Sequence, residues 1–402
     1  MKNFNIGIMG CLINCTNLGC VALSYTLIQE LEKIASRNDI AFTYTVFDEN
    51  YLDNSISLMS EKLKVDKSRI KRGVVGMPQM YNIKSVIRAL TKQAIPNIQM
   101  INDIKKCDLV IDMTGGDSFS DIYGKERFYR LTTIKRIVER LNVPLILGPQ
   151  TYGPFTDTKV LNYAKKVLLN AKTIIARDDD SAQYVESIIG APVSSTIDIA
   201  FGLQYTEKSL DSDGKIKIGI NPSGLLGARK NENTTLNSQI NVDYERYIRE
   251  IVDCLSKNDC FQIYLISHVG KEAIECFPNI KNVVYCEPFK DPMEAKSFIS
   301  SMDLFLGSRM HATIGAFSAG VPMIPIAYSK KFKGLYHSLG YDFLIDLQVM
   351  STEEAITKTL YYVEEIEKLN TALVNSKELV NQRYNKLLQV LECALLFYLK
   401  NE

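Results

Sequence analysis

Short apolar runs alternate with amphipathic, helix-like stretches along almost the whole chain. In the first half, each run ends close to a Gly, Pro, Asn or Asp turn, as strands commonly do. The runs predict strands at 4–9, 42–47, 109–113, 144–147 and 173–176, and then at 216–220, 261–267, 283–286, 304–307 and 323–327. Strands that alternate with helices, such as the helix expected over 242–255, are typical of parallel sheets with crossover connections. The pattern therefore predicts an α/β protein.

A polar, turn-rich stretch at 206–215 separates the two series of strands, and its composition favours an interdomain linker. We expect an N-terminal doubly wound domain over 1–207, a linker over 208–215, a C-terminal doubly wound domain over 216–350 and a helical segment over 351–402. Domains of this type bind ligands at the carboxyl ends of their strands, so we expect the active site in a cleft between the two domains. The strand-poor stretch at 224–237 is expected to be a mobile loop near the domain junction.

Composition and charge narrow the classes of function. The chain has 402 residues, 46% of them hydrophobic and 23% charged, which is ordinary for a globular protein of two domains. Its formal net charge is +1, so no overall field attracts nucleic acid, and any anion site must be built locally. The chain shows neither a signal peptide nor an apolar stretch of roughly 20 residues, and we expect a cytoplasmic protein.

The cysteines predict neither a disulfide framework nor a metal site. There are nine of them, an odd number, at irregular spacing. The closest group, Cys11, Cys15 and Cys20, has a spacing that matches no zinc pattern. Because no carboxylate pair or histidine cluster has the spacing of metal ligands either, we expect no metal and no cofactor.

The segment 303–334 is the richest in candidate chemistry. It predicts a strand, a tight turn and a helix, with Ser308 as N-cap and with Arg309, Met310 and His311 in the first helical turn. Such a helix start offers unpaired N–H groups and the positive end of the helix dipole. Arg309 can grip a carboxylate or phosphate with two hydrogen bonds, and His311 can donate a proton near neutral pH. The alternative is that Arg309 pairs with a surface acid and His311 is a hydrogen-bonded helix residue.

Several motifs in this order resemble those of the polysaccharide pyruvyl transferase family, over roughly residues 5–335. They are N-x-G at 17–19, Gly-Gly-Asp at 115–117 with Asp121, G-x-Q-x-x-G-P at 148–154, R-D-x-x-S at 177–181, and Ser-Arg-Met-His-Ala at 308–312 followed by Gly-Val-Pro at 320–322 and Y-x-x-K-x-x-G at 328–334. Met310 stands where leucine is more usual, a change of similar volume. The Gly-Gly-Asp loop lacks a third glycine that is common in the family, which leaves the shape of the acceptor side open.

The resemblance implies two Rossmann-like domains that face a central cleft in a GT-B-like arrangement. It implies transfer of pyruvate from a phosphoenolpyruvate donor to a sugar of a cell-surface polysaccharide, or to its lipid-linked oligosaccharide precursor, with formation of a cyclic ketal. By motif matching, Arg309, Met310 and His311 would lie at the donor, with Arg177 as a second cation from the N-terminal, acceptor-side domain. Because an imidazole can transfer a proton near neutral pH, His311 is the candidate general acid. The alternatives are a GT-B glycosyltransferase that uses a nucleotide sugar and a non-catalytic sugar-binding protein of the same fold.

Several other candidates have a structural explanation beside the functional one. Gly115 and Gly116 let a ligand approach the backbone, with Asp117 as a cap or hydroxyl acceptor, but a plain strand-to-helix turn needs the same residues. Gln150 can hydrogen-bond sugar hydroxyls or serve as a buried structural amide. For Arg177, the alternative is a salt bridge to the adjacent Asp178 or Asp179.

The last candidates depend on their place beside a strand or on the family motif. Asn17 and Gly19 form the turn after the first strand, and His268 closes the strand at 261–267 as a second candidate acid or base. Lys331 would reach the donor phosphate as a flexible charge. His337 is expected to be structural. The acceptor sugar, the stereochemistry of the ketal, peripheral membrane contact through a lipid-linked acceptor and the oligomeric state stay open.

Overall fold

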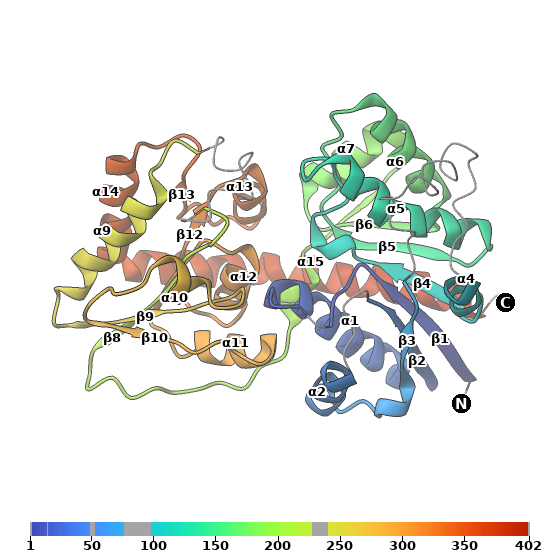
Figure 1. Ribbon diagram of the computed structural model, residues 1–402, viewed down its shortest axis with the longest axis horizontal. Helices are drawn as coiled ribbons and strands as arrows, with labels where there is room; N and C mark the ends of the chain where they lie inside the picture. The colour runs from blue at the N-terminus through green and yellow to red at the C-terminus, as the bar shows by residue number, and fades with distance from the viewer. Residues whose placement is uncertain (1, 14, 49–52, 76–97, 227–239, 401–402) are drawn as a thin grey trace, which may run out of the picture. The chain divides into compact units, whose positions relative to one another are not determined.

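The computed structural model describes residues 2–13, 15–48, 53–75, 98–226 and 240–400, which form two compact units (Figure 1). Unit 1 comprises Met1–Cys15, Leu23–Ile199 and Arg383–Glu402, and unit 2 comprises Thr16–Ala22 and Ala200–Gln382. Each unit contains a parallel sheet with helices between the strands, so the predicted α/β class is confirmed. Each unit includes a segment that is distant in sequence from the rest of it: Thr16–Ala22 in unit 2 and Arg383–Glu402 in unit 1. The domain bounds expected from the sequence stay a prediction.

Unit 1 is built on a sheet of seven strands in the order β3-β2-β1-β4-β5-β6-β7. The strands are β1 (Lys2–Met9), β2 (Ile40–Phe47), β3 (Ile70–Gly73), β4 (Leu109–Asp112), β5 (Leu145–Gln150), β6 (Thr173–Ala176) and β7 (Ser194–Ser195). The helices are α1 (Leu18–Arg37), α2 (Asp53–Leu63), α4 (Ile98–Lys105), α5 (Lys125–Arg140), α6 (Thr158–Asn170) and α7 (Asp179–Ile189). The strand order reverses between β1 and β4, where doubly wound sheets open a crevice at their carboxyl edge.

Unit 2 repeats this plan with six strands in the order β10-β9-β8-β11-β12-β13. The strands are β8 (Ile216–Asn221), β9 (Phe261–Leu265), β10 (Val283–Tyr285), β11 (Leu304–Gly307), β12 (Met323–Ala327) and β13 (Ile345–Asp346). The helices are α9 (Tyr244–Ser256), α10 (Glu272–Cys276), α11 (Pro292–Ile299), α12 (Met310–Ser318), α13 (Lys330–His337), α14 (Thr352–Glu364) and α15 (Ile366–Lys400). Here the order reverses between β8 and β11.

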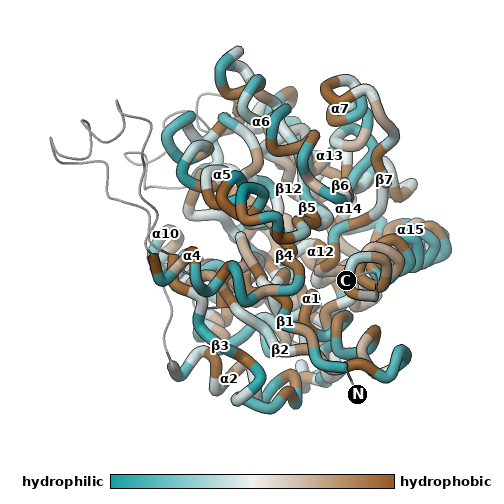
Figure 2. Tube along the Cα trace, turned by 90° about the vertical axis from the view of Figure 1, so that its right-hand side faces the viewer, coloured by the Kyte–Doolittle hydropathy of each residue, from teal (hydrophilic) through white to brown (hydrophobic). Residues whose placement is uncertain are grey.

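The hydrophobic pattern identified the central strands because they are buried on both faces. Every residue of β4, β5, β11 and β12 is buried, whereas helices such as α5 and α6 alternate between hydrophobic and hydrophilic positions (Figure 2). The ten predicted strands are present, and β3, β7 and β13 are additional. Residues 206–215, all of them described, contain no helix or strand. The predicted loop at 224–237 falls mostly outside the described residues.

Helix α15 contributes to both units. Its last part, from Arg383 onward, belongs to unit 1, where Leu387 and Leu391 are fully buried. Arg383 forms an ion pair with Asp179 at 2.6 Å. The first strand and the last helix therefore stabilise the same unit. Among the helices in the described part of the chain, none is both long enough and apolar enough to cross a membrane.

Candidate functional site

Arg309 lies at the reversal point of the unit 2 sheet, directly after β11. The backbone N–H groups of Ser308 and Arg309 donate to the backbone oxygen and to Oδ1 of Asn221, at 2.9 and 3.2 Å. Helix α12 begins at Met310, so its N-cap is Arg309, and the prediction of Ser308 as N-cap was wrong. The reason is that Ser308 is fully buried and its hydroxyl accepts a hydrogen bond from the Tyr244 hydroxyl at 2.7 Å.

A buried carboxylate fixes the Arg309 guanidinium. Nε of Arg309 lies 3.2 and 3.1 Å from the two carboxylate oxygens of Glu272, and Nη2 contacts the same group. Glu272 in turn accepts hydrogen bonds from the N–H groups of Gly224, at 2.9 Å, and Val269, at 3.2 Å. Burial alone would lower the pKa of Arg309, but the Glu272 carboxylate raises it, so the guanidinium stays charged. The acid that pairs with Arg309 is therefore a buried one, not a surface one.

His311 lies in the first turn of α12, as predicted, and packs against the start of α1. A Cβ atom at position 19 would lie 2.4 Å from Nδ1 of His311, so this contact requires the glycine at Gly19. The carbonyl oxygen of the Asn17 side chain accepts a hydrogen bond from the Gly19 N–H at 3.1 Å. The N–H of Leu18 donates to the carbonyl of His268 at 3.1 Å. The sequence placed the N-x-G turn in the N-terminal domain, whereas the structure places it in unit 2. The turn contacts both His268, through a backbone hydrogen bond, and the ring of His311.

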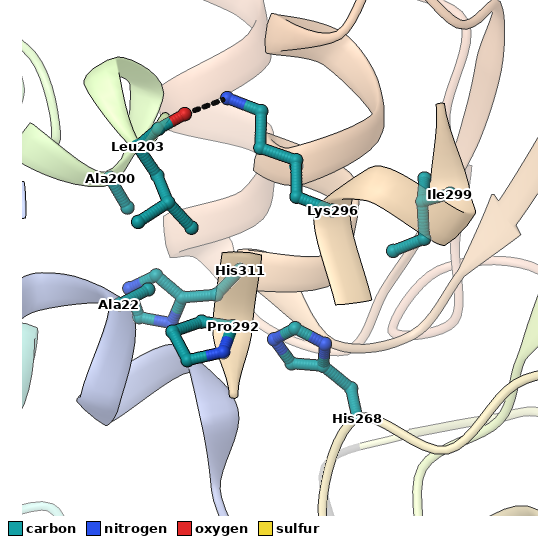
Figure 3. A pocket seen from close by; sticks show the side chains of 9 residues that line it. Ala22, Ala200, Leu203, His268, Pro292, Lys296, Ile299 and His311 are labelled. Carbon is teal, nitrogen blue, oxygen red and sulfur yellow. Dashed lines mark hydrogen bonds between the residues drawn. The ribbon is translucent and has the colours of Figure 1, made fainter. Parts of the chain in front are cut away.

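His268 and His311 line one small cavity of about 10 Å³, together with Lys296 and with apolar side chains (Figure 3). His268 is 5% exposed, and neither of its ring nitrogens has a hydrogen-bond partner among the described residues. Burial, and then the neighbouring His311 and Arg309, lower the pKa of His268 to about 3. The ring is therefore neutral near pH 7. The role of His268 as a second candidate acid or base stays a prediction.

Lys296 is a cavity residue that the sequence analysis missed. Its Nζ donates to the carbonyl of Leu203 at 2.8 Å and lies 4.9 Å from the centre of the Tyr205 ring. Burial lowers the pKa of Lys296 to about 7, while the carbonyl and the ring favour the ammonium form. The sequence feature that could have identified Lys296 is its position one helical turn before Ile299, which places it on the buried side of α11.

The predicted glycine-rich loop lies in unit 1, after β4. Gly115 and Gly116 have φ values of +61° and +82°, which disfavour any residue with a Cβ atom. The carboxylate of Asp117 accepts a hydrogen bond from the Tyr123 hydroxyl at 2.8 Å. Gln150 is fully buried, and its amide nitrogen donates to the carbonyl of Asp112 at 3.1 Å. For Gln150, the structure matches the alternative of a buried structural amide.

Arg177 is also in unit 1, and it is 4% exposed. Its Nη1 forms an ion pair with Asp198 at 2.8 Å, and its Nε donates to the Thr151 hydroxyl at 2.7 Å. Burial alone would lower the pKa of Arg177, and Asp198 raises it. Asp178, one of the two expected partners, accepts a hydrogen bond from the Ser181 N–H as the N-cap of α7. The ion-pair partner of Arg177 is Asp198. The sequence did not predict this partner, because Asp198 lies outside the R-D-x-x-S motif.

The remaining candidates are in unit 2. Met310 and Lys331 are both partly exposed, in the first turns of α12 and α13. His337 is 74% exposed and lies 3.0 Å from a carboxylate oxygen of Asp342. The structure therefore gathers Asn17, Gly19, His268, Arg309 and His311 in one unit. Within the described ranges, no group of His, Cys, Asp and Glu side chains is arranged to hold a metal ion.

Comparisons with known proteins bear on the family and the fold of the chain. The family model for polysaccharide pyruvyl transferase matches residues 17–330. The amylovoran biosynthesis protein AmsJ of Erwinia amylovora is 22% identical over 370 residues, which cover 86% of this chain and 87% of that protein. The UDP-GlcNAc 2-epimerase from Neisseria meningitidis bound to UDP-GlcNAc has a similar fold, with a TM-score of 0.52, 13% identity and coverage of 95% of this chain and 99% of that one. The glycotransferase of kitacinnamycin gives a TM-score of 0.53 at 11% identity, over 98% of this chain and 99% of that one. These likenesses confirm two Rossmann-like domains of GT-B-like fold.

Proposed function

Since the chain belongs to the polysaccharide pyruvyl transferase family, we propose that it transfers pyruvate from phosphoenolpyruvate to a sugar and forms a cyclic ketal. The family is one of transferases that act in polysaccharide synthesis, and the similarity to an amylovoran biosynthesis protein agrees with this. The acceptor would be a sugar of a cell-surface polysaccharide or of its lipid-linked precursor. The observation that carries the proposal is the charged Arg309 guanidinium, held by Glu272 beside His311 at the carboxyl edge of a parallel sheet.

The donor carries a carboxylate and a phosphate, and the start of α12 is suited to anions of this kind. Arg309 supplies a permanent cation, and the first N–H groups of α12 add hydrogen-bond donors and the positive end of the helix dipole. Ser308, Met310, Arg177 and Lys331 are further candidates for binding the donor. For these four residues, and for the acceptor-side candidates Asn17, Gly19, Gly115, Gly116, Asp117 and Gln150, contact with substrate stays a prediction.

The proposed reaction begins with proton transfer from His311 to the donor methylene, which becomes a methyl group. The oxocarbenium-like carbon is then attacked by a sugar hydroxyl to form a tetrahedral phospho-ketal. Phosphate leaves, and a neighbouring hydroxyl closes the cyclic ketal. Two hydroxyl protons are released in total: one replaces the proton that His311 gave, and the other leaves with phosphate. Positioned general-acid catalysis of this kind contributes about 10²- to 10⁴-fold.

The test is phosphate release from phosphoenolpyruvate across a panel of free and lipid-linked sugars, with each product identified by its mass. We expect release only in the presence of a suitable acceptor, together with a product that carries one pyruvate ketal. His311→Asn should lower turnover by about 100-fold or more, because it removes the proton donor. Binding of a nucleotide sugar without any response to phosphoenolpyruvate would instead identify a glycosyltransferase.

A further inference from the structure

Tyr244 lies outside the sequence motifs, at the start of α9, yet its hydroxyl contacts the turn that carries the candidate donor site. The side chain is 2% exposed. Its hydroxyl accepts a hydrogen bond from the Ser223 N–H at 2.8 Å and donates one to Oγ of Ser308 at 2.7 Å. Burial raises the pKa of Tyr244, so the hydroxyl keeps the proton that it donates. The hydroxyl therefore acts as a donor and as an acceptor at once.

These two hydrogen bonds join two turns that lie at the reversal point of the unit 2 sheet. Strands β8 and β11 are neighbours, and Asn221 at the end of β8 pairs with Gly307 at the end of β11. Ser223 follows β8 and Ser308 follows β11, and both residues are fully buried. A single hydroxyl that is bonded to both turns fixes the distance between them.

The same two turns hold the guanidinium of Arg309. The Gly224 N–H, in the turn after β8, donates to a carboxylate oxygen of Glu272 at 2.9 Å. That oxygen accepts a hydrogen bond from Nε of Arg309 at 3.1 Å, and Arg309 directly follows Ser308. The Tyr244 hydroxyl closes this series of contacts into a ring, because it is bonded to both turns. A shift of either turn would therefore move the guanidinium relative to its carboxylate.

We propose that Tyr244 is a positioning residue of the donor site, whose hydroxyl acts through Ser308 and the turn after β8 to set the orientation of the Arg309 guanidinium. Because it is buried, Tyr244 acts only through these groups and does not touch the substrate. The consequence for binding of the donor rests on the proposed function.

The arginine NMR spectrum of the full-length protein tests the inference without any substrate. We would label the protein with ¹⁵N-arginine and record the Nε–H signals of the wild type, Tyr244→Phe and Tyr247→Phe, and Arg309→Ala would identify the Arg309 signal by its loss. Tyr247 is the matched control, because it is fully buried in the same helix and its hydroxyl bonds to that of Thr359, in α14, at 2.7 Å.

We expect Tyr244→Phe to shift the Arg309 Nε–H signal and to speed the exchange of its proton with water, and Tyr247→Phe to leave both unchanged. An unchanged Arg309 signal in Tyr244→Phe, or the same change in both variants, would overturn the inference. If Tyr244→Phe does not fold, Ser308→Ala decides, because it removes the same contact from the other side. An Arg309 signal in Ser308→Ala identical to that of the wild type would then overturn it.

Calorimetric titration of phosphoenolpyruvate separates positioning from a merely structural role. Tyr244→Phe should weaken the affinity about tenfold, whereas Tyr247→Phe should stay within about twofold, although each variant loses one buried hydroxyl. In the Ser308→Ala protein, the further change Tyr244→Phe should cost less than about threefold, because the contact through which it acts is already gone. An equal loss with and without Ser308 would contradict the inference. A wild type that binds no phosphoenolpyruvate would overturn the proposed function alone, since the arginine spectra stand without it.

Discussion

Glu272 determines where the Arg309 guanidinium points. Its carboxylate contacts two nitrogens of Arg309 and accepts hydrogen bonds from two backbone N–H groups, so it joins the turn after β8 and the start of α10 to the candidate donor site. A buried ion pair adds little to the free energy of unfolding compared with apolar residues of the same size. Removal of one partner is nevertheless destabilising, because it leaves a buried charge without compensation. The pair therefore orients the guanidinium and makes unit 2 sensitive to either residue.

Glu272→Gln should destabilise the protein by about 3 kcal/mol, because the amide cannot neutralise the buried Arg309. Chemical denaturation followed by circular dichroism would measure the loss in the free energy of unfolding. Glu353→Gln is the matched control, since Glu353 is 67% exposed and pairs with an exposed arginine, and it should change stability little. Equal stability of Glu272→Gln and wild type would show that the pair does not hold Arg309 in place.

The neutral His268 predicts a pH dependence of stability. Its pKa is about 3 in the folded protein, below the ordinary value of 6.5 that applies to the unfolded chain. Between these values the unfolded chain binds a proton that the folded protein does not, so stability that is present above pH 6.5 is lost as the pH falls. From pH 7 to pH 5 this residue should account for a loss of about 2 kcal/mol.

Urea unfolding of the wild type and His268→Leu at the two pH values measures this difference. The variant should lack the contribution, so its stability should fall by about 2 kcal/mol less than that of the wild type. The same pH dependence in both proteins would contradict the assignment of a neutral, buried imidazole at His268.

At the scale of elements, the start of α1 and the start of α12 depend on each other. Gly19→Ala should raise the intrinsic helix propensity of α1, yet it should lower activity by about 10-fold or more, because the new methyl group displaces the His311 ring. Initial rates of phosphate release would measure the effect. Ser36→Ala, an exposed change in the same helix, is the control and should leave the rate unchanged. A fully active Gly19→Ala protein would show that the position of this ring is unimportant.

The hydrophobic pattern predicted the central strands well because it reports burial. The strands β6 and β11 were predicted with the bounds that the structure has, since each is a short apolar run with a sharp polar or glycine boundary. By contrast, β3 contains the exposed Lys71 and Arg72, and β7 and β13 have only two residues each. Such strands are held by pairing with a neighbour, which a local pattern cannot show.

The candidate site was predictable in its motif residues but not in their partners. Arg309 and His311 were found because a strand, a turn and a helix start fall together in the sequence. Glu272 was not found, because many acids are available to an arginine and only the fold selects one. For the same reason, the contact of Gly19 with His311 could not be derived from residues so far apart along the chain.

At the scale of the whole molecule, the chain returns at its end to the unit in which it began. Leu391 is fully buried in unit 1, whereas Val374, in the same helix, is 61% exposed. Leu391→Ala should therefore cost about 2–5 kcal/mol of unfolding free energy, and Val374→Ala less than about 0.5 kcal/mol. Denaturation curves for the two variants would measure this. If Leu391→Ala lowered the free energy of unfolding as little as Val374→Ala does, the end of α15 would not contribute to the core of unit 1.

The central claim is that a small dianion binds where α12 begins, through Arg309. Calorimetric titration of phosphoenolpyruvate into the wild type, Arg309→Ala and the control Arg246→Ala, an exposed arginine in surface ion pairs, tests it most directly. The account predicts that affinity falls by about 100-fold in Arg309→Ala, which loses a charge-assisted contact, and that Arg246→Ala binds as the wild type does. Undiminished binding by a folded Arg309→Ala protein would contradict the account.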